Sequence, residues 1–575
     1  MTQEKHLITS ALPYANGPIH FGHLAGAYFP GDVFNRHQKM KGNKTLFICG
    51  SDEHGVAIML NAKKAGEDYQ TYVDKWHKQH NGLFKAAGIE FDFFGQTSAD
   101  YHAEEVVRWF EVLNEKGLID TQDCDQLFCN SCENHLPDRF VEGECYKCGY
   151  EAARGDECSN CGELIDPVKL KKPVCKICGN DGSKAEISPV KVTQYYLMLS
   201  KYHKEFRAWF ETRTDWRKTV YPYVDGLTKE SLHDRAISRD LDWGIDVPLA
   251  EAKGKKLYVW FDAPIGYVSN TKKFLEDKGS SEHYLNDWWN NKDVKISNFI
   301  GKDNIIFHAV IFPCMSMASG FARPTDQVPA NQFLNLNGKQ FSKSTGWYIE
   351  GNEAIEEFGQ DAIRYYLLSI LPEGSDSSFT WEQFEAKVNN ELANNIGNFL
   401  NRCLKFISKN WPDGLEKEHF VGFAESEWGK TLTTDIKELH QLLDDYKVRQ
   451  GLEKLMLIGQ TANNYFSDQA PWAQIKEDRD AAAKTLAYSA SYAMTLGVLF
   501  SPFLPSLSGK ILDHFESLLS DELKTEIYNG NIQALETVFT QNGLHLTKEV
   551  VALVPKLDKD LVASKIEHLK SLEQS

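Results

Sequence analysis

The chain has 575 residues, too many for a single hydrophobic core, and we expect three or four domains. Its 42% hydrophobic and 25% charged residues are typical of a globular protein, and no apolar run approaches the roughly 18 residues of a membrane span. No charged-then-apolar leader opens the chain, so we expect a cytoplasmic protein with no membrane partner. The formal net charge of −18 argues against a general nucleic-acid coat protein, although a local basic surface would still allow an RNA partner.

The first predicted elements are a strand, a tight turn and the start of a helix. The apolar residues 6–9 precede the segment 11–23, which contains a turn of the type Asn-Gly-Pro and then His20 and His23. A strand followed by a turn and a helix start directs backbone N–H groups and a helix dipole toward an anion. The two imidazoles, three residues apart, fall on one face of the first helical turn. This segment therefore predicts contacts to phosphate.

Residues 1–115 alternate short apolar strands with helical stretches, which predicts a parallel sheet with its ligands at the carboxyl ends of the strands. We interpret this region as the first half of an α/β nucleotide-binding domain. The strand predicted at 44–49 is followed by Asp52, whose carboxylate offers a partner for a substrate ammonium group. A surface ion pair is the alternative role for Asp52.

A cysteine-rich insertion is predicted at 116–230. Eight of the twelve cysteines form four Cys-x-x-Cys pairs, a pattern that indicates zinc rather than disulfides. Four-thiolate sets are closed to substrate, so we predict one or two structural Zn²⁺ ions. The pairs are Cys129 with Cys132, Cys145 with Cys148, Cys158 with Cys161, and Cys175 with Cys178.

The α/β pattern resumes at 231–325, the predicted second half of the catalytic domain, which includes Arg239 as a candidate partner for a carboxylate or phosphate. A linking region at 326–385 follows. It contains a loop in which Lys343, flanked by Ser342 and Ser344, offers an ammonium group and hydroxyls to phosphate oxygens. A solvent-exposed lysine is the alternative interpretation of Lys343.

Residues 386–575 consist of long amphipathic helical stretches, which predicts a helical bundle. One apolar stripe is expected to face the core, and a polar stripe of Asn394, Asn398 and Arg402 lies on the opposite side at intervals of four residues. Such a stripe is usually only a solvated face. The apolar stripe consists of Leu392, Ile396, Phe399, Cys403 and Phe406.

The His-x-Gly-His segment and the loop at 339–344 together resemble the two signatures of the class I aminoacyl-tRNA synthetases. The surrounding residues resemble the methionyl-tRNA synthetases over essentially the whole chain. The second signature departs from the family form, because Gln340 replaces its first lysine and Phe341 its methionine, although Lys339 lies next door.

The resemblance implies an α/β catalytic domain with a parallel sheet, split by a zinc-knuckle insertion and followed by an α-helical anticodon-binding bundle. It implies a methionine–tRNA ligase that forms methionyl-adenylate from methionine and ATP with Mg²⁺. The methionine would then be transferred to the terminal adenosine of methionine tRNA, both initiator and elongator.

The resemblance also assigns residues. Gly301 and Asp303 are expected to contact the ATP ribose, and Lys343 with Ser342 the phosphates. It favours two nested zinc sites, the inner one of Cys145, Cys148, Cys158 and Cys161 and the outer one of Cys129, Cys132, Cys175 and Cys178. The anticodon would be read by Asn394, Asn398, Arg402 and the stacking residue Trp472. The expected methionine site consists of Leu12, Tyr14, Asp52, Trp260, Ala263, Pro264, Tyr267, Phe307 and His308.

Alternatives remain open at this stage. Another class I synthetase for an aliphatic amino acid or cysteine would share both signatures. A zinc-knuckle protein that binds nucleic acid without catalysis would share the cysteines only. At single positions, Asp303 is a candidate helix cap and Trp472 a candidate packing residue.

Overall fold

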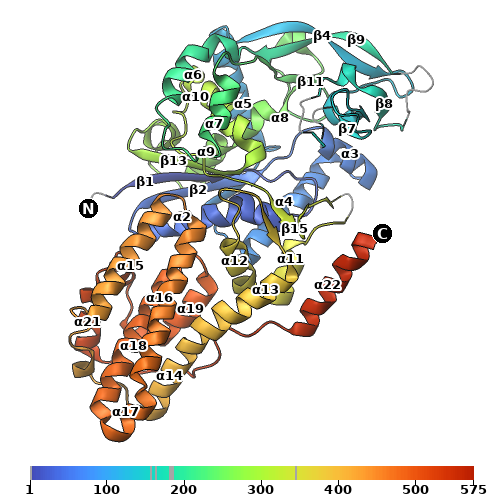
Figure 1. Ribbon diagram of the computed structural model, residues 1–575. Helices are drawn as coiled ribbons and strands as arrows, with labels where there is room; N and C mark the ends of the chain where they lie inside the picture. Colours follow the sequence, from blue (N-terminus) through green and yellow to red (C-terminus); the bar gives the residue numbers. More distant parts are fainter. Residues whose placement is uncertain are drawn as a thin grey trace.

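The computed structural model describes residues 3–155, 158, 160–161, 165–179, 187–343 and 346–574. Figure 1 shows an α/β body, with a separate lobe of β-strands beside it, joined to an elongated bundle of helices. The C-terminal helix α22 (Lys559–Gln574) returns from the bundle to the α/β body.

The α/β body is built on a five-stranded parallel sheet in the order β14-β13-β1-β2-β3. β1 is central, and all of its residues except Lys5 are buried, which fits a strand that is covered on both faces. The carboxyl ends of these strands lie along one edge, which is where ligands of such sheets bind. The strands are β1 (Lys5–Ser10), β2 (Lys44–Ser51), β3 (Phe93–Gln96), β13 (Val294–Gly301) and β14 (Ala330–Asn331).

Alternate residues of β1 enter different hydrophobic clusters, as the two-residue period of a strand requires. Leu7 packs with α5 (Asp100–Glu115), α9 (Gly266–Asp277) and α10 (Phe312–Ser319) on one face. On the other face, Ile8 packs in the cluster that contains α2 (Phe29–Met40) and α4 (Tyr69–Ala86). That second cluster continues into the helical bundle, so the sheet and the bundle share one core.

The insertion begins with a long antiparallel pair, β4 (Ile119–Cys129) and β9 (Ile187–Leu197). These strands carry a small sheet of β6 (Val141–Glu144), β7 (Ala153–Arg154) and β8 (Lys171–Cys175) at their far end. The helices α6 (His203–Phe210) and α7 (Tyr221–Thr228), which we assigned to the insertion, contribute to the hydrophobic cluster of the catalytic sheet.

A linking region connects the two bodies through a small sheet and three helices. The sheet has the order β16-β15-β17, and β16 leads directly into the loop of the second signature. The elements are β15 (Leu334–Leu336), β16 (Lys339–Gln340), β17 (Ser377–Phe379), α11 (Gly351–Phe358), α12 (Gln360–Ser369) and α13 (Trp381–Lys387).

The helical bundle starts with one continuous helical rod. α13 passes into a π-helical segment, Val388–Gly397, and then into α14 (Asn398–Asn410). α18 (Arg479–Phe500) is buried along almost its whole length, as expected of a helix that is apolar on all sides. In the part of the chain that the structure describes, no helix is both long and apolar enough to span a membrane. The remaining main helices are α15 (Glu427–Asp444), α16 (Val448–Gln469), α17 (Pro471–Glu477), α19 (Pro505–Leu512), α20 (Asp521–Tyr528) and α21 (Ile532–Asn542).

Two shorter π-helical segments lie in the α/β body at the edge where ligands bind. One, Leu24–Tyr28, follows the signature histidines, and the other, Phe307–Ile311, follows β13. π-helical turns are uncommon and occur frequently at functional sites.

Candidate active site

A cavity of about 510 Å³ opens at the carboxyl ends of β1, β2 and β13. It is the place where a parallel sheet of this kind binds its ligands. All nine residues expected to contact methionine line it, together with His20, His23, Gly301 and Asp303. Segments separated by up to 300 residues of sequence therefore meet in one cavity.

One end of the cavity is aromatic, and the hydroxyl group of Tyr267 is paired with a histidine there. The Tyr267 hydroxyl lies 2.8 Å from Nε2 of His308, and His308 Nδ1 lies 3.0 Å from the carbonyl oxygen of Asn304. Because the carbonyl can only accept, Nδ1 carries the proton and Nε2 accepts from Tyr267. Burial lowers the pKa of His308 to about 4, so the imidazole is neutral. The rings of Trp260 and Phe307, 4.7 Å apart, complete an apolar wall.

Asp52 supplies an unpaired carboxylate oxygen to the cavity. Its Oδ1 is shielded from solvent and has no hydrogen-bond partner among the described residues. Burial, and next the negative charge of Asp262, raise the pKa of Asp52 well above its ordinary value. A buried carboxylate without a partner is costly, and an ammonium group of a ligand would relieve that cost.

His20 and His23 are fixed by the backbone of the turn that carries them. His20 Nδ1 accepts from the Gly22 N–H at 3.1 Å, and His23 Nδ1 accepts from the His20 N–H at 3.1 Å. The sequence forms this turn because His20 caps the short helix α1 (Phe21–His23). Burial, followed by nearby positive charge, lowers the pKa of His20 to about 3 and that of His23 well below its ordinary value. Both imidazoles are neutral, and their protons lie on Nε2.

The second signature lies against the first. The ring of Phe341 stacks on that of His20, with 4.7 Å between centroids and 8° between planes. The side chain of Lys343 lies close to Gly17. A β-carbon added at Gly17 would lie 3.4 Å from both Cδ and Nζ of Lys343. Burial lowers the pKa of Lys343 to about 8. The two signatures, about 320 residues apart in sequence, are thus in contact.

Other residues of this loop have different surroundings. The Ser342 N–H donates to the Trp347 carbonyl at 2.8 Å, and Ser344 lies outside the described residues. Gln340 and Phe341 line the cavity, whereas Ser342 and Lys343, which we expected to contact the phosphates, are not among the residues that line it. Lys339 is exposed, and its Nζ lies 3.2 Å from Glu573 on α22.

Gly301 and Asp303 sit where β13 ends. A β-carbon at position 301 would lie 2.7 Å from Oδ1 of Asp303. Any residue other than glycine would therefore displace this carboxylate. Burial raises the pKa of Asp303 above its ordinary value. Asp303 lines the cavity, and the oxygen atoms of its carboxylate can accept hydrogen bonds from hydroxyl groups of a ligand.

The structure does not bring Arg239 into the cavity. Its Nε lies 2.9 Å from Oδ2 of Asp138, and its guanidinium group lies 4.0 Å from the centre of the Tyr258 ring. Asp138 and its neighbour Arg139, which we did not single out, line the cavity from the insertion. Asp138 has φ of 49°, which is uncommon for a residue other than glycine, but no sequence pattern reveals this strain.

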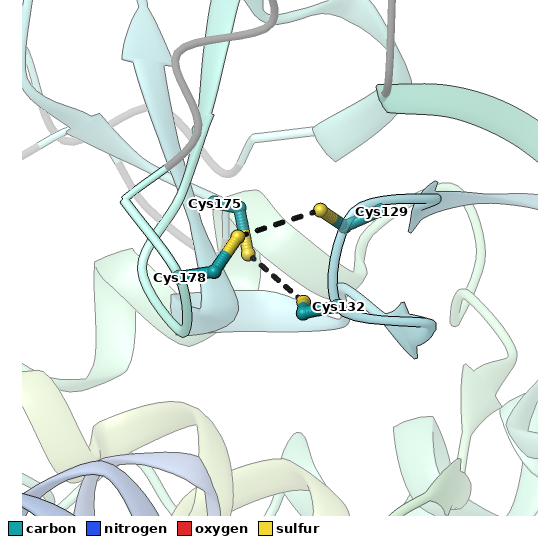
Figure 2. Close-up of side chains that lie close together, drawn as sticks. All are labelled: Cys129, Cys132, Cys175 and Cys178. Carbon is teal, nitrogen blue, oxygen red and sulfur yellow. Dashed lines mark hydrogen bonds between the residues drawn. The ribbon is translucent and has the colours of Figure 1, made fainter.

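The insertion contains two groups of four cysteines, and they are the two nested sets that the resemblance implied. Figure 2 shows the outer set, with its Sγ atoms turned toward one another. Sγ–Sγ distances are 3.7 Å for Cys129–Cys178 and 3.8 Å for Cys132–Cys175. In the inner set they are 4.0 Å for Cys145–Cys161 and 3.6 Å for Cys148–Cys158.

These distances fit a metal ion. Zn–S bonds of about 2.3 Å in a tetrahedron require Sγ–Sγ distances of about 3.8 Å. Gly149 and Gly179, each directly after a second cysteine, have φ of 76° and 73°, which allows the tight turn of a knuckle. Gly162, the corresponding glycine of another pair, lies outside the described residues. Both groups could hold zinc.

Two of the three residues of the polar stripe are exposed, as its spacing predicts, and Arg402 is partly buried. Asn394 and Asn398 face solvent, while Leu392, Ile396, Phe399 and Cys403 are fully buried. Arg402 lies with its guanidinium group 5.0 Å from the centre of the Trp472 ring and 4.9 Å from that of Phe466. Trp472 itself is 40% exposed. The stripe and the indole of α17 therefore form one accessible surface.

Comparison with known families agrees with this geometry. A family model described as "tRNA synthetases class I (M)" matches residues 6–404, and one described as "Anticodon binding domain of methionyl tRNA ligase" matches residues 416–543. The chain belongs to the class I methionyl-tRNA synthetases. The family resemblance seen in the sequence, and the fold that it implied, are thereby confirmed.

Relatives and solved structures show the same likeness. The methionine–tRNA ligase of Thermococcus kodakarensis is 40% identical over 88% of this chain and 69% of its own length. That of Flavobacterium psychrophilum is also 40% identical, over 88% of this chain and 74% of its own. The fold is similar to that of Mycobacterium tuberculosis methionyl-tRNA synthetase in complex with methionyl-adenylate, with a TM-score of 0.76 and 23% identity over 96% of this chain and 100% of that one.

Proposed function

We propose that the cavity binds methionine and ATP and joins them as methionyl-adenylate, from which the chain charges methionine tRNA. Ligation of methionine to tRNA is the reaction of the family to which this chain belongs. The observation that carries the assignment of the site is the convergence in one cavity of an aromatic wall, an unpaired carboxylate oxygen and the histidine turn.

The methionine end of the cavity follows from the chemistry of the amino acid. The α-ammonium group pairs with Oδ1 of Asp52, which has no hydrogen-bond partner among the described residues. The thioether side chain enters the aromatic wall of Trp260, Tyr267 and Phe307, where a soft and polarisable sulfur is favoured. The neutral state of His308 matters here, because an imidazolium would place a positive charge beside an apolar side chain.

At the phosphate end, the reaction needs positioning and charge stabilisation rather than a covalent nucleophile of the protein. The methionine carboxylate attacks the α-phosphorus of ATP, and pyrophosphate leaves. His20 and His23 keep their Nε2–H groups free to donate to phosphate oxygens, because Nδ1 of each is held by the turn. Lys343 supplies its ammonium group as negative charge develops on pyrophosphate. Mg²⁺, bound with ATP, would offset further phosphate charge.

The second step transfers methionine to tRNA, as a hydroxyl of the terminal ribose attacks the methionyl carbonyl and AMP leaves. The exposed surface of Asn394, Asn398, Arg402 and Trp472 is proposed to hold the anticodon at the same time. Amide and guanidinium groups donate to the edges of unpaired bases, and an indole stacks on one of them.

The two cysteine groups are proposed to hold structural Zn²⁺. Eight thiolates would keep the insertion folded at a fixed distance from the cavity, to which it contributes Asp138 and Arg139. Metal analysis of the purified protein is expected to find about two zinc ions per chain, given four thiolates for each ion. One ion per chain would remove the outer site only, and none would contradict the proposal.

Amino-acid-dependent exchange of pyrophosphate into ATP tests the substrate. Exchange is expected with methionine, and with homocysteine about 10- to 200-fold less efficiently, because one methyl group is worth about 1–3 kcal/mol in a hydrophobic pocket. Stronger exchange with leucine or cysteine than with methionine would contradict the assignment of the cavity.

A further inference from the structure

A third histidine lies behind the turn that carries His20 and His23. His80, on α4, is only 1% exposed, and its Nε2 lies 2.9 Å from the carbonyl oxygen of Gly17. Because a carbonyl can only accept, Nε2 of His80 carries the proton. Its Nδ1 is buried and has no hydrogen-bond partner among the described residues.

The charge state of His80 suits a donor to a carbonyl. Burial lowers its pKa to about 4, and the positive charge of Lys343 contributes to that shift. The ring is therefore neutral at physiological pH and acts through a hydrogen bond rather than through charge. Tyr72, also on α4, donates its hydroxyl to the carbonyl of Asn16 at 3.4 Å. One helix thus holds two successive carbonyl groups of the turn.

The same glycine also lies next to Lys343. A β-carbon at Gly17 would lie 3.4 Å from both Cδ and Nζ of that lysine. Gly17 is therefore held by His80 at its carbonyl group and approached at its α-carbon by the Lys343 side chain. A displacement of the turn would displace the surface on which the ammonium group lies.

We infer that His80 is a positioning residue for adenylate formation, which fixes the Gly17 turn so that the Lys343 ammonium group is held beside the phosphates. The inference rests on the proposed function of the cavity. His80 does not line the cavity, and we expect its effect to pass through Gly17 and the neighbouring Lys343. A misplacement of about 1 Å in such an arrangement can lower a rate by about 100-fold.

A double-mutant cycle in the full chain tests this role. The rate of adenylate formation is measured in a single turnover for the wild type, His80→Leu, Lys343→Ala and the double variant. His80→Leu is expected to be about 10- to 100-fold slower, with the dissociation constant of methionine changed by less than about twofold. In the Lys343→Ala background the same change is expected to cost less than about threefold, because no ammonium group remains to be positioned.

Two further variants separate positioning from general stability. His80→Gln keeps an amide N–H near the position of Nε2 and is expected within about threefold of the wild-type rate. His514→Leu removes a buried histidine of the bundle, 8% exposed, and is expected to leave the rate unchanged. Where His80→Leu does not fold, His80→Asn takes its place in the cycle, because its shorter side chain cannot reach the Gly17 carbonyl.

The inference is overturned if the His80 variant loses the same factor in both backgrounds, or if glutamine fails to restore the rate in a folded protein. A different result contradicts the proposed function instead. If Lys343→Ala alone forms adenylate at the wild-type rate, the lysine has no part in the chemistry, whatever His80 does.

Discussion

At the two signatures, the side chains of His20, His23 and Lys343 are partly buried, and that burial lowers their pKa values. On the helical rod, Asn394 and Asn398 are exposed, and Trp472 is 40% exposed. The first region is organised before its ligands arrive, as charge stabilisation in a transition state requires. The second keeps its polar groups in water until an unpaired base replaces that water. The residues proposed for the chemistry are thus partly buried, whereas most of those proposed for recognition are exposed.

The largest effect is expected for the cation of the buried region. Lys343→Ala should slow adenylate formation by about 100- to 1,000-fold, since it removes one group that stabilises developing charge. The affinity for tRNA should remain as in the wild type, because the exposed region is untouched. Single-turnover rates and tRNA binding measure the two effects. Lys339→Ala is the matched control and should cost less, since this lysine pairs with Glu573 on the surface. An equal loss of rate in both variants would contradict a specific role of Lys343 in stabilising the developing charge.

The exposed region is tested at its aromatic residue. Trp472→Ala should lower the efficiency of tRNA charging by about 5- to 150-fold, because a stacked base contributes about 1–3 kcal/mol. Pyrophosphate exchange without tRNA should be unchanged. The control is Trp411→Ala, which removes a similar contact, with Arg479 at 4.5 Å from the ring, at the other end of α14. A joint loss of charging, exchange and melting temperature at position 472 would mark Trp472 as a packing residue.

The smallest effect concerns the ionisation of the buried cation. The pKa of Lys343 is lowered to about 8, so the ammonium form predominates below that pH and is lost as pH rises through it. The kcat/KM for ATP in pyrophosphate exchange should therefore fall above pH 8, by about tenfold for each further pH unit. Lys343→Arg should remove this decline, because a guanidinium group stays protonated. A decline that persists unchanged in Lys343→Arg would belong to another group.

Much of the fold was predictable because its signals are local. The alternation of apolar strands with helices indicated a parallel sheet, and the spacing of Leu392, Ile396, Phe399 and Cys403 identified the buried side of the helical rod. Phe406, expected in the same stripe, is only partly buried. The rod contains a π-helical segment that the spacing did not reveal, since one wide turn changes the register by only a single residue.

Long-range contacts of single side chains were less accessible. Arg239 was proposed to bind a ligand group, yet its guanidinium is paired with Asp138, a residue about 100 positions earlier. Arg139 lines the cavity although it comes from the insertion. Neither contact leaves a pattern in the sequence, because each depends on how the insertion folds back over the sheet. The contact between the two signatures was expected only because the family pairs them.

The π-helical segments have a consequence for how their helices accept changes in length. An α-helix turns by about 100° per residue, so removing one residue ordinarily rotates everything beyond it away from its neighbours. A π-helical turn contains one residue more than an α-helical turn. Deleting one residue there can therefore convert it into an α-helical turn without rotating the rest of the helix. We expect such a deletion at Phe307–Ile311 to leave the packing of α10 unchanged. It would, however, place a different side chain at the position that now faces the cavity. The segment is thus a point where substrate preference can be altered while the frame around it keeps its register.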